Sequence, residues 1–582
     1  MGDLADVQLT FVETLDDLDN FRAWLGQRRE WLGADIETTG LNCGRDKVRL
    51  MQFGDLDQGW AIPWEDYRGA IKDLLPRYKG RIVFHNAIFD TKFLKREGVH
   101  IPQEWCHDTM VMCHLLDPRT SIGLKSAAAR YVDRRAWIGK DALSEAFRHG
   151  KWDWATVPVD HPSYWLYSAL DTVLTAHLAA AIWPKVEPFR KVYEVEMACI
   201  HVLRDAGLTG VRIDMPYVEE KRVELLLELE QLSAQIPCEP SKDAQVVKML
   251  QERGAVLTHK TKSGAISVDD EALAEVEPSF PDIVKPLREW RTKSRLVSSY
   301  LDNMLSMNVD GILHPSVKPL GARTARMSVT EPALQTLPRG RTIRDAFISR
   351  EGQTLILADY EQAELRVLAS FAHETSMIEA FMRGEDLHRW VASQAYQKTT
   401  EEVTKPERQV SKNTQFARVY GAGNAKIALT AGVPVAVIDQ FVMRYNQLFP
   451  GIPEFTNATI REVLSTQFNG ESKCGYVETI LGRRLPVEHN KSYVGVNYKV
   501  QCSATADLLK LKLVELDAAG LGEFIRLPVH DEIMFEVPDD QLDEVEEVVR
   551  RVMPETKLFE CPITVDVERT KCWGHKYGWA EN

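Results

Sequence analysis

The chain lacks several features that mark secreted, membrane-embedded and zinc-finger proteins. It has nine cysteines among 582 residues, an odd number scattered without a Cys-x-x-Cys pair. Reduced thiols fit this pattern better than a disulfide framework or a zinc site does. The acidic N-terminal stretch 1–6 has no signal or transit pattern, and no apolar run is long enough to span a membrane. We therefore expect a protein of a reducing, cytosol-like compartment.

Positive charge is also scarce, because the formal net charge is −14 at pH 7. Global acidity does not exclude a local basic groove, and some carboxylates serve as metal ligands. Two stretches concentrate the basic residues: Lys285, Arg288, Arg291, Lys293 and Arg295 in one, and Arg323, Arg326, Arg339, Arg341 and Arg344 in the next. For the first stretch, a solvated helix face and contact with phosphates are equally compatible with the pattern.

The stretch Leu355–Ala369 is predicted to be a buried strand followed by a helix. Its first residues are apolar, and Leu365, Leu368, Ala369 and Ala372 then recur at helical spacing. Asp359 falls where the strand should end. Taken alone, an Asp before a helix is more often an N-cap than a metal ligand.

A second carboxylate pattern strengthens the interpretation of Asp359 as a metal ligand. Residues 524–537 alternate with a period of two, which predicts a hairpin with His530, Asp531 and Glu532 at its tip. These residues are a poor choice for a tight turn, which favours Asn-Gly or Asp-Gly. If Asp359 and Asp531 meet on one sheet, they form a site for two hard cations, as phosphoryl transfer requires.

Between these stretches, residues 408–421 are predicted to form a helix with one functional stripe. Arg408, Lys412, Phe416 and Tyr420 fall every four residues, so they share one slowly drifting face. Two cations followed by two aromatic rings suit a nucleotide, with phosphates at one end and base and sugar at the other. The alternative is an ordinary amphipathic helix with solvated cations.

These three stretches, in this order, resemble the A, B and C motifs of family A DNA polymerases, the class of bacterial DNA polymerase I. The matching patterns are Asp-Tyr-x-Gln-x-Glu-Leu-Arg, Arg-x3-Lys-x3-Phe-x3-Tyr-Gly and Val-His-Asp-Glu. Further matching segments are Leu334-Gln335, Asp386-Leu-His388-Arg, Gly475-Tyr-Val-Glu-Thr479, Gly482-Arg-Arg484 and Gln501. Glu361, Ala417 and Cys502 depart from the usual pattern of the family but leave the implied chemistry intact.

The N-terminal region carries a second ordered set of carboxylates. Asp35 and Glu37 share one face of a predicted strand, Asp90 follows a second strand, and Tyr167 and Asp171 are neighbours on a predicted helix. An Asp-x-Glu pair alone is common and usually solvated. With Asn86, the ordered set resembles the motifs of the DEDD proofreading 3′–5′ exonucleases that use a tyrosine. Four carboxylates can hold two metals, and a phenol can orient the attacking water.

The resemblance implies a role for each polymerase residue. Asp359, Asp531 and the carbonyl of Tyr360 would bind two Mg²⁺ ions, replaceable by Mn²⁺, with Glu532 and Lys412 among the catalytic residues. The nucleotide site would comprise Arg408, Lys412 and His388 at the triphosphate, Phe416 at the sugar, Tyr420 at the template base, Glu364 in the space of a 2′-OH, and Gln362. Arg326, Gln501 and His530 would contact the primer–template near its end, and Asn86 would contact DNA in the exonuclease. The exonuclease metals would be held by Asp35, Glu37, Asp90 and Asp171.

The expected fold is a multidomain α/β and α+β protein. An RNase H-like exonuclease domain at 1–182 precedes a right-hand polymerase domain at 183–582. The resemblance places the thumb at about 210–310, the palm at about 311–385 and 470–582, and the fingers at about 386–469. No long linker separates the two domains, so we expect them to pack together.

The leading prediction is therefore a template-directed DNA polymerase with proofreading that acts in DNA replication. Two alternatives remain: a single-subunit RNA polymerase-like enzyme, and a nuclease or DNA-binding scaffold with an inactive polymerase site. The expected partners are primer–template DNA and dNTPs, with a helicase and a single-strand-binding protein as further candidates. We expect a monomer without membrane association in the bacterial cytoplasm, encoded by a phage or a bacterium.

Overall fold

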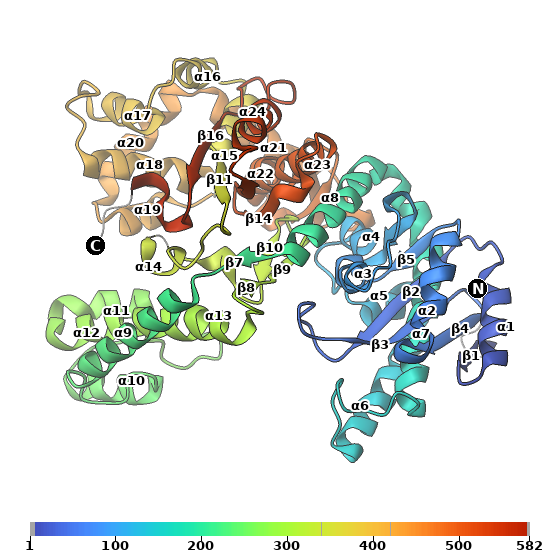
Figure 1. The fold of residues 1–582 in the computed structure, drawn as a ribbon. Helices are drawn as coiled ribbons and strands as arrows, with labels where there is room; N and C mark the ends of the chain where they lie inside the picture. Colours follow the sequence, from blue (N-terminus) through green and yellow to red (C-terminus); the bar gives the residue numbers. More distant parts are fainter. Residues whose placement is uncertain (1–5, 339, 420, 579–582) are drawn as a thin grey trace. The chain divides into compact units, whose positions relative to one another are not determined.

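The computed structural model describes residues 6–338, 340–419 and 421–578, and the structural statements below refer to them. The chain forms two compact units, which are described one at a time. The first contains residues up to 209, 317–328 and 358–568, and the second contains 210–316, 329–357 and the residues from 569 onward. Figure 1 labels the elements of both units.

The N-terminal part of the first unit is built on a six-stranded mixed sheet of order β1-β4-β3-β2-β5-β6. Strands β2, β5 and β6 are parallel, whereas β3 runs antiparallel to both β2 and β4. The strands are β1 Gln8–Phe11, β2 Leu32–Thr38, β3 Val48–Gly54, β4 Gln58–Pro63, β5 Ile82–Phe84 and β6 Cys106–Asp108. The helices are α1 Leu15–Leu25, α2 Trp64–Leu74, α3 Ala87–Arg96, α4 Thr109–Leu116, α5 Leu124–Tyr131, α6 Ile138–Gly150, α7 Pro162–Val186 and α8 Arg190–Thr209.

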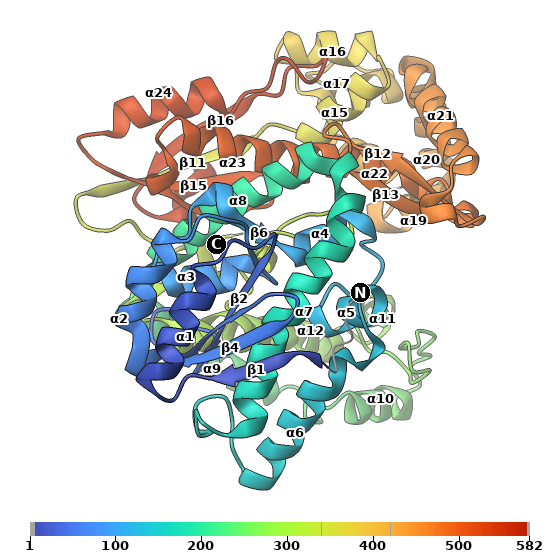
Figure 2. The ribbon, with the colours of Figure 1, turned by 90° about the vertical axis from the view of Figure 1, so that its right-hand side faces the viewer.

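Helix α7 packs directly on the sheet, against β2 and β3 (Figure 2). Two glycines permit this close approach. A Cβ atom at Gly33 would lie 2.0 Å from the carbonyl oxygen of Thr172, and one at Gly54 would lie 2.5 Å from the Thr172 hydroxyl. The contact therefore sets the face of α7 that carries Asp171 against the strand that carries Asp35 and Glu37.

The rest of the first unit surrounds a four-stranded sheet of order β14-β15-β11-β16. Its strands are β11 Gln353–Tyr360, β14 Ile525–Val529, β15 Glu532–Pro538 and β16 Val565–Thr570, and a separate hairpin joins β12 Cys474–Glu478 to β13 Arg484–Glu488. The helices are α15 Ala363–Phe371, α16 Thr375–Met382, α17 Leu387–Tyr396, α18 Lys405–Val419, α19 Asn424–Ala431, α20 Val435–Leu448, α21 Gly451–Ser465, α22 Val494–Cys502, α23 Leu508–Ala518 and α24 Leu542–Val552. A π-helical segment, Ser503–Asp507, connects α22 to α23.

A buried ionic network ties α8 to the part of this unit that surrounds the four-stranded sheet. Lys510 donates to both carboxylate oxygens of Glu196 at 2.7 and 2.9 Å, and Arg483 contacts the same carboxylate and Asp507. Glu196, Asp507 and Lys510 have 0% side-chain exposure. Burial acts to raise the pKa of Glu196, but Lys510 and Arg483 hold it below its usual value. Breaking such a pair leaves an uncompensated buried charge. The network therefore disfavours separation of α8 from the segments that carry Arg483 and Lys510.

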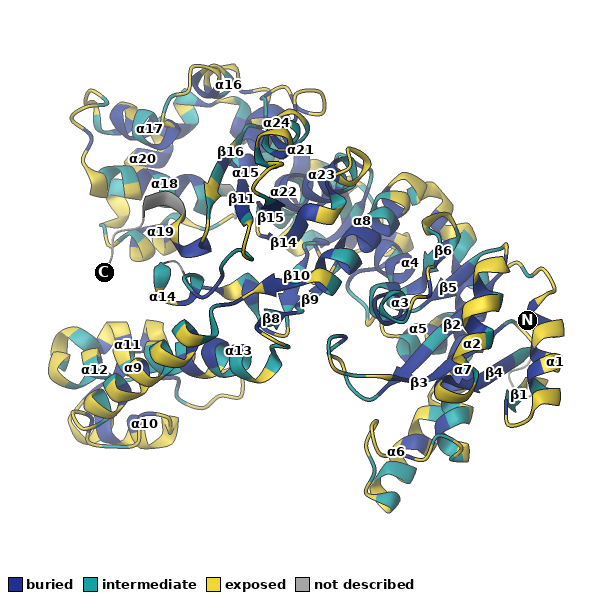
Figure 3. Ribbon diagram, viewed as in Figure 1, coloured by how far each residue is buried: buried dark blue, intermediate teal, exposed yellow. Residues whose placement is uncertain are grey.

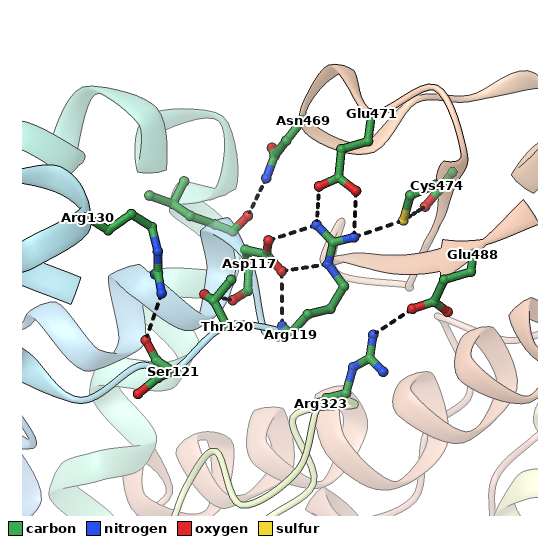
Figure 4. A network of polar contacts seen from close by, with 12 residues as sticks. Asp117, Arg119, Thr120, Ser121, Arg130, Arg323, Asn469, Glu471, Cys474 and Glu488 are labelled. Atoms are coloured by element: carbon green, nitrogen blue, oxygen red, sulfur yellow. Dashed lines mark hydrogen bonds and ion pairs between the residues drawn. The ribbon is translucent and has the colours of Figure 1, made fainter. Parts of the chain in front are cut away.

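A second polar network links the same two regions nearer the surface (Figure 4). Arg119, which follows α4, donates to Asp117 and, at 2.5 and 3.0 Å, to both oxygens of Glu471. Asn469 donates to the carbonyl of Leu116 at 3.2 Å. These contacts agree with the expectation that the two regions pack without a long linker.

The second unit is mainly helical, and the outer surfaces of its helices are largely exposed (Figure 3). Its elements are β7 Val211–Arg212, α9 Met215–Ser233, α10 Asp243–Glu252, α11 Asp270–Val276, α12 Pro281–Leu296, the π-helical Val297–Leu301, α13 Asp302–Met307, β8 Ile312–Leu313 and α14 Arg341–Arg344. A further strand pair joins β9 Ser316–Lys318 to β10 Ser328–Thr330.

Helix α12 carries the whole of the first basic cluster, and three of its cations form ion pairs. Arg288 pairs with Asp270 and Glu277, Arg291 with Asp243, and Lys293 with Glu228 and Glu289. These cations are therefore matched by acids of the same unit.

One helical stretch of the described chain, Pro162–Thr209, is by length and composition apolar enough for a membrane span, because it contains an 18-residue window with a mean hydropathy of 1.2. The sequence expectation that no such run exists is therefore corrected. In that window, 67% of the residues are buried inside the protein, as in the core helix of a globular domain. A second candidate arises only if α19 and α20, bent by 117°, are counted together.

Candidate active sites

The first candidate site lies where β11 meets the β14–β15 hairpin. The backbone N–H of Tyr360 donates to the carbonyl of Asp531 at 3.2 Å, which joins the end of β11 to the hairpin turn. Asp359, one residue earlier, thus lies beside Asp531. The phenol of Tyr360 points into the core, where it donates to the carbonyl of Met553 at 3.0 Å, so only its backbone belongs to the site.

The hairpin turn is tighter than the sequence predicted. Val529 pairs with Glu532, so only His530 and Asp531 form the connection, and His530 has a φ of +59°. The prediction that Glu532 lies at the tip is wrong, because this residue begins β15 and its side chain is buried. A two-residue connection matches the strand twist with positive φ values in the turn.

Negative charge is concentrated around Asp531. Burial and the neighbouring Asp359 raise the pKa of Asp531 to about 7, and Glu364 and Glu532 act in the same direction. Repulsion of this kind is relieved by a bound cation. The nearby donors are oxygens, which are the ligands preferred by Mg²⁺. The residues present therefore fit a divalent hard cation.

Glu364, the predicted sugar-selecting residue, is held in place by an ion pair. Arg326 donates to its carboxylate at 2.6 Å and, through Nε, to the hydroxyl of Thr505 at 2.7 Å. Thr505 lies in the π-helical turn after α22 and donates to the carbonyl of Gln501, whose side chain is buried. The structure thus brings together two residues predicted to contact the primer–template and the predicted sugar selector.

A second group of predicted residues gathers between α17 and α18. Arg408 donates to Asp386 at 2.6 Å, and the rings of His388 and Phe416 lie 5.8 Å apart. Burial lowers the pKa of His388 to about 4, and the cations Lys412 and Arg408 act in the same direction. Helix α18 spans Lys405–Val419, which confirms the helix predicted for the stripe. Tyr420, the last residue of the stripe, lies outside the described residues.

Two residues predicted to contact a nucleotide or DNA lie immediately before a helix. Gln362 precedes α15 with a φ of +53°, and Asn86 precedes α3 with a φ of +80°. Both side chains are partly exposed. The backbone N–H of Asn86 donates to Asp108 at 3.1 Å, so this residue also fixes the turn from β5 into α3.

The second candidate site lies on β2 of the six-stranded sheet. Asp90 of α3 accepts a hydrogen bond from the backbone N–H of Ile36 at 3.2 Å, between Asp35 and Glu37. Burial raises the pKa of Asp35 to about 6, and burial together with Asp35 raises the pKa of Glu37 and Asp90. This carboxylate cluster is a fit for hard divalent cations for the same reason as the first site.

Helix α7 completes this site with residues from consecutive turns. Ser168 donates to Glu37 at 3.0 Å, and the buried Asp171 is linked to the cluster by Lys125, which contacts Asp171 and acts electrostatically on Asp35 and Glu37. Burial and the nearby Glu37 raise the pKa of the Tyr167 phenol above its ordinary value, so it stays protonated. The predicted set Asp35, Glu37, Asp90, Tyr167 and Asp171 is thus gathered in one place.

Sequence reasoning missed two residues of this second site. Lys125 of α5 is buried and its amine contacts Asp171; burial lowers its pKa to about 7, against the opposite effect of Asp35 and Glu37. Asp108 accepts from the backbone N–H groups of Asn86, Ala87 and Met110 and so holds the start of α3. Asp108 is the N-cap of α4, a signal that could have drawn attention to it, whereas no local pattern marks Lys125.

Two family models match the chain. The model described as DNA polymerase family A matches residues 217–575, and the model described as 3′-5′ exonuclease matches residues 9–187. Each match includes the carboxylates of one candidate site.

Similar proteins agree with these matches. The DNA polymerase of Mycobacterium phage D29 is 30% identical, over 99% of this chain and 98% of that protein. The DNA polymerase I of Chloroflexus aurantiacus is also 30% identical, over 84% of this chain and 54% of that protein. A solved structure of the POL domain of Pol1 from M. smegmatis, in complex with DNA primer-template and dNTP, has the same fold, with a TM-score of 0.78, 24% identity, and coverage of 97% of this chain and 99% of that one. The chain therefore belongs to the family A DNA polymerases and carries a 3′-5′ exonuclease domain.

Proposed function

We propose that this polymerase extends DNA primers at Asp359 and Asp531 and proofreads at the Asp35–Glu37 cluster. The observation that carries the proposal is the meeting of Asp359 and Asp531 through the Tyr360–Asp531 backbone hydrogen bond. Divalent cations, Mg²⁺ in the first place, supply charge neutralisation for the primer 3′-OH and the triphosphate when bound there. Primer extension with dNTPs and Mg²⁺ tests the proposal, and no extension with either Mg²⁺ or Mn²⁺ would contradict it.

Family membership and site chemistry weigh against the alternatives. The family model names a DNA polymerase, and Glu364, the proposed 2′-OH selector, is held by an ion pair with Arg326. An inactive scaffold would have no need for two buried carboxylate clusters, whose mutual repulsion is unfavourable without cations. We therefore place the RNA polymerase-like and scaffold readings behind proofreading DNA synthesis.

In the proposed exonuclease site, protein side chains and backbone N–H groups position the DNA strand and the attacking water. The protonated phenol of Tyr167 can donate a hydrogen bond to a water at the scissile phosphate. Ser168 orients Glu37, and the Ile36 N–H orients Asp90. Asn86 is proposed to contact the DNA strand from the turn before α3.

In the polymerase, α17 and α18 are proposed to bind the incoming nucleotide. Arg408, Lys412 and His388 would contact the triphosphate, Phe416 the sugar, and Tyr420 the template base. Gln362 lies at the start of α15, next to Glu364, and is assigned to the same pocket. Arg326, Gln501 and His530 are assigned to the minor groove near the primer end, where every base pair presents acceptors.

The Lys412→Ala variant tests the triphosphate assignment. Losing a charge-assisted contact should lower kcat/KM for dNTP about ten- to a hundred-fold, with little change in duplex affinity. Single-nucleotide incorporation over a range of dNTP concentrations measures the effect. Lys405→Ala, on the exposed first turn of the same helix, is the matched control. If Lys412→Ala instead lost duplex binding and kept its dNTP response, α18 would face DNA.

Sugar selection gives a second test, in which two variants should change different discriminations. Glu364→Ala should admit ribonucleotides, because it opens the space held by the Arg326 ion pair. Phe416 has no hydroxyl, so a dideoxynucleotide leaves a buried polar group underpaired, at a cost of about 1–3 kcal/mol. Phe416→Tyr supplies that hydroxyl and should largely erase dideoxy discrimination while ribonucleotides stay excluded.

Competition of dNTP with ddNTP, and of dNTP with rNTP, measures both effects on the parent and the two variants. Unchanged dideoxy discrimination in Phe416→Tyr would show that Phe416 does not face the sugar. Unchanged ribonucleotide exclusion in Glu364→Ala would move the 2′ selector elsewhere.

We propose an exonuclease domain at 1–182 and a polymerase domain at 183–582, with the thumb at about 210–310, the palm at about 311–385 and 470–582, and the fingers at about 386–469. We further propose a monomer that acts in the bacterial cytoplasm on primer–template DNA, alongside a helicase and a single-strand-binding protein. The similarity to phage and bacterial polymerases supports this setting.

A further inference from the structure

A buried lysine lies beside the carboxylates of the proposed exonuclease site. Lys125 reaches in from α5, its side chain is 7% exposed, and its amine contacts a carboxylate oxygen of Asp171. The same amine lies 4.7 Å from the ring centroid of Tyr167. One cation therefore contacts two of the residues that α7 contributes to the site, Tyr167 and Asp171.

The charged groups around this amine are mostly the site's own acids. Asp35 and Glu37 act on it electrostatically from β2, and Lys140 of α6 is the opposing cation. Lys140 itself is exposed and lies over the ring of Trp137 at 5.3 Å. The Lys125 ammonium thus neutralises part of the same cluster that is assigned to divalent cations.

An ammonium and a divalent cation compete for the same carboxylate. A metal at Asp171 needs a carboxylate oxygen, and the two positive charges would repel each other at contact distance. Because Asp171 and Lys125 are both buried, water screens this repulsion poorly. For the metal to bind fully, the ammonium must leave the position that it holds in this structure.

We propose that Lys125 is an internal cation that competes with divalent metal for Asp171 and so sets the metal concentration at which the exonuclease site fills. This inference rests on the proposed metal-binding role of Asp171. In the polymerase site, the nearby cation Arg326 pairs with Glu364, which is not among the proposed metal ligands. Proofreading would then demand more metal than polymerisation does.

Direct Mn²⁺ binding to the full chain tests the proposal, by titration calorimetry or electron paramagnetic resonance at one fixed pH. The polymerase site is first silenced with Asp359→Asn and Asp531→Asn, so that only exonuclease binding remains. Lys125→Met keeps the length of the side chain and removes its charge. We expect it to bind Mn²⁺ at the exonuclease site at least about tenfold more tightly, as the loss of one nearby like charge predicts.

Two matched variants sharpen the result. Lys125→Arg keeps the charge and should keep the weaker parental affinity. Lys79→Met removes an exposed cation of the same domain and should leave affinity close to the parental value. Primer extension by Lys125→Met in the unsilenced chain, together with thermal unfolding in EDTA, verifies that the protein is folded.

Unchanged or weaker Mn²⁺ binding by folded Lys125→Met would overturn the inference, because Lys125 would then support the ligand instead of competing for it. The metal assignment is tested separately with Asp35→Ala combined with Glu37→Ala in the silenced chain. If that variant still bound Mn²⁺ like the silenced parent, the proposed exonuclease site itself would be wrong.

Discussion

Asp531→Asn is expected to lower primer extension by about three orders of magnitude or more, the scale on which lost metal coordination acts. Asparagine keeps the shape of the side chain but removes the charge that binds a cation. Asp359→Asn should have the same effect, because both residues are assigned to the same pair of cations. Single-turnover extension of a labelled primer with one correct dNTP measures the loss.

The thermal unfolding of the Asp531→Asn variant shows whether the substitution disturbs folding. Burial and Asp359 raise the pKa of Asp531, so neutralising this residue relieves repulsion in the metal-free state. Metal-free Asp531→Asn should therefore unfold at a Tm no lower than that of the parent. Digestion of single strands should continue at the parental rate, and Asp540→Asn, on an exposed turn after β15, should extend normally. Near-normal extension by either Asp359→Asn or Asp531→Asn would refute the two-cation assignment.

Asp35→Ala combined with Glu37→Ala is expected to abolish 3′–5′ digestion of single-stranded DNA, again by about three orders of magnitude or more. The pair forms one edge of the cluster that also includes Asp90 and Asp171. Removing both side chains takes away half of the predicted metal ligands and leaves Ser168 without its carboxylate partner. Release of the 3′-labelled nucleotide from a single strand gives the rate.

The polymerase should keep working in this variant, with more errors. Extension of a matched primer should stay near the parental rate, while the share of extended product that retains a mismatch should rise because the mismatch is no longer removed. Asp57→Ala, an exposed carboxylate between β3 and β4 of the same sheet, is the control for surface charge. Digestion at the parental rate by the folded double variant would place the nuclease site elsewhere.

The local elements of both sites follow from the sequence. Asp359 lies near the end of a buried strand because apolar residues precede it, and α15 follows as the helical spacing predicted. The stripe from Arg408 to Phe416 lies on α18 because residues four apart share one helix face. Asp35 and Glu37 share one face of β2 because alternation places residues i and i+2 on the same side. These are short-range patterns that the backbone geometry fixes without help from distant residues.

Tertiary structure decided the contacts between residues far apart in the sequence. Lys125 meets Asp171, and Glu196 meets Arg483 and Lys510, because α5, α7, α8 and α23 pack together, and no local pattern announces such a pairing. The turn of the polymerase hairpin was also settled by cross-strand pairing: Val529 binds Glu532, so Glu532 enters the strand although the sequence places it beside two turn residues. The sequence alone therefore predicted the element that carries each of these candidate residues except Glu532, and it did not predict Lys125 or Asp108. Packing decided which charges face one another, because a buried charge takes its partner from whichever element folds against it.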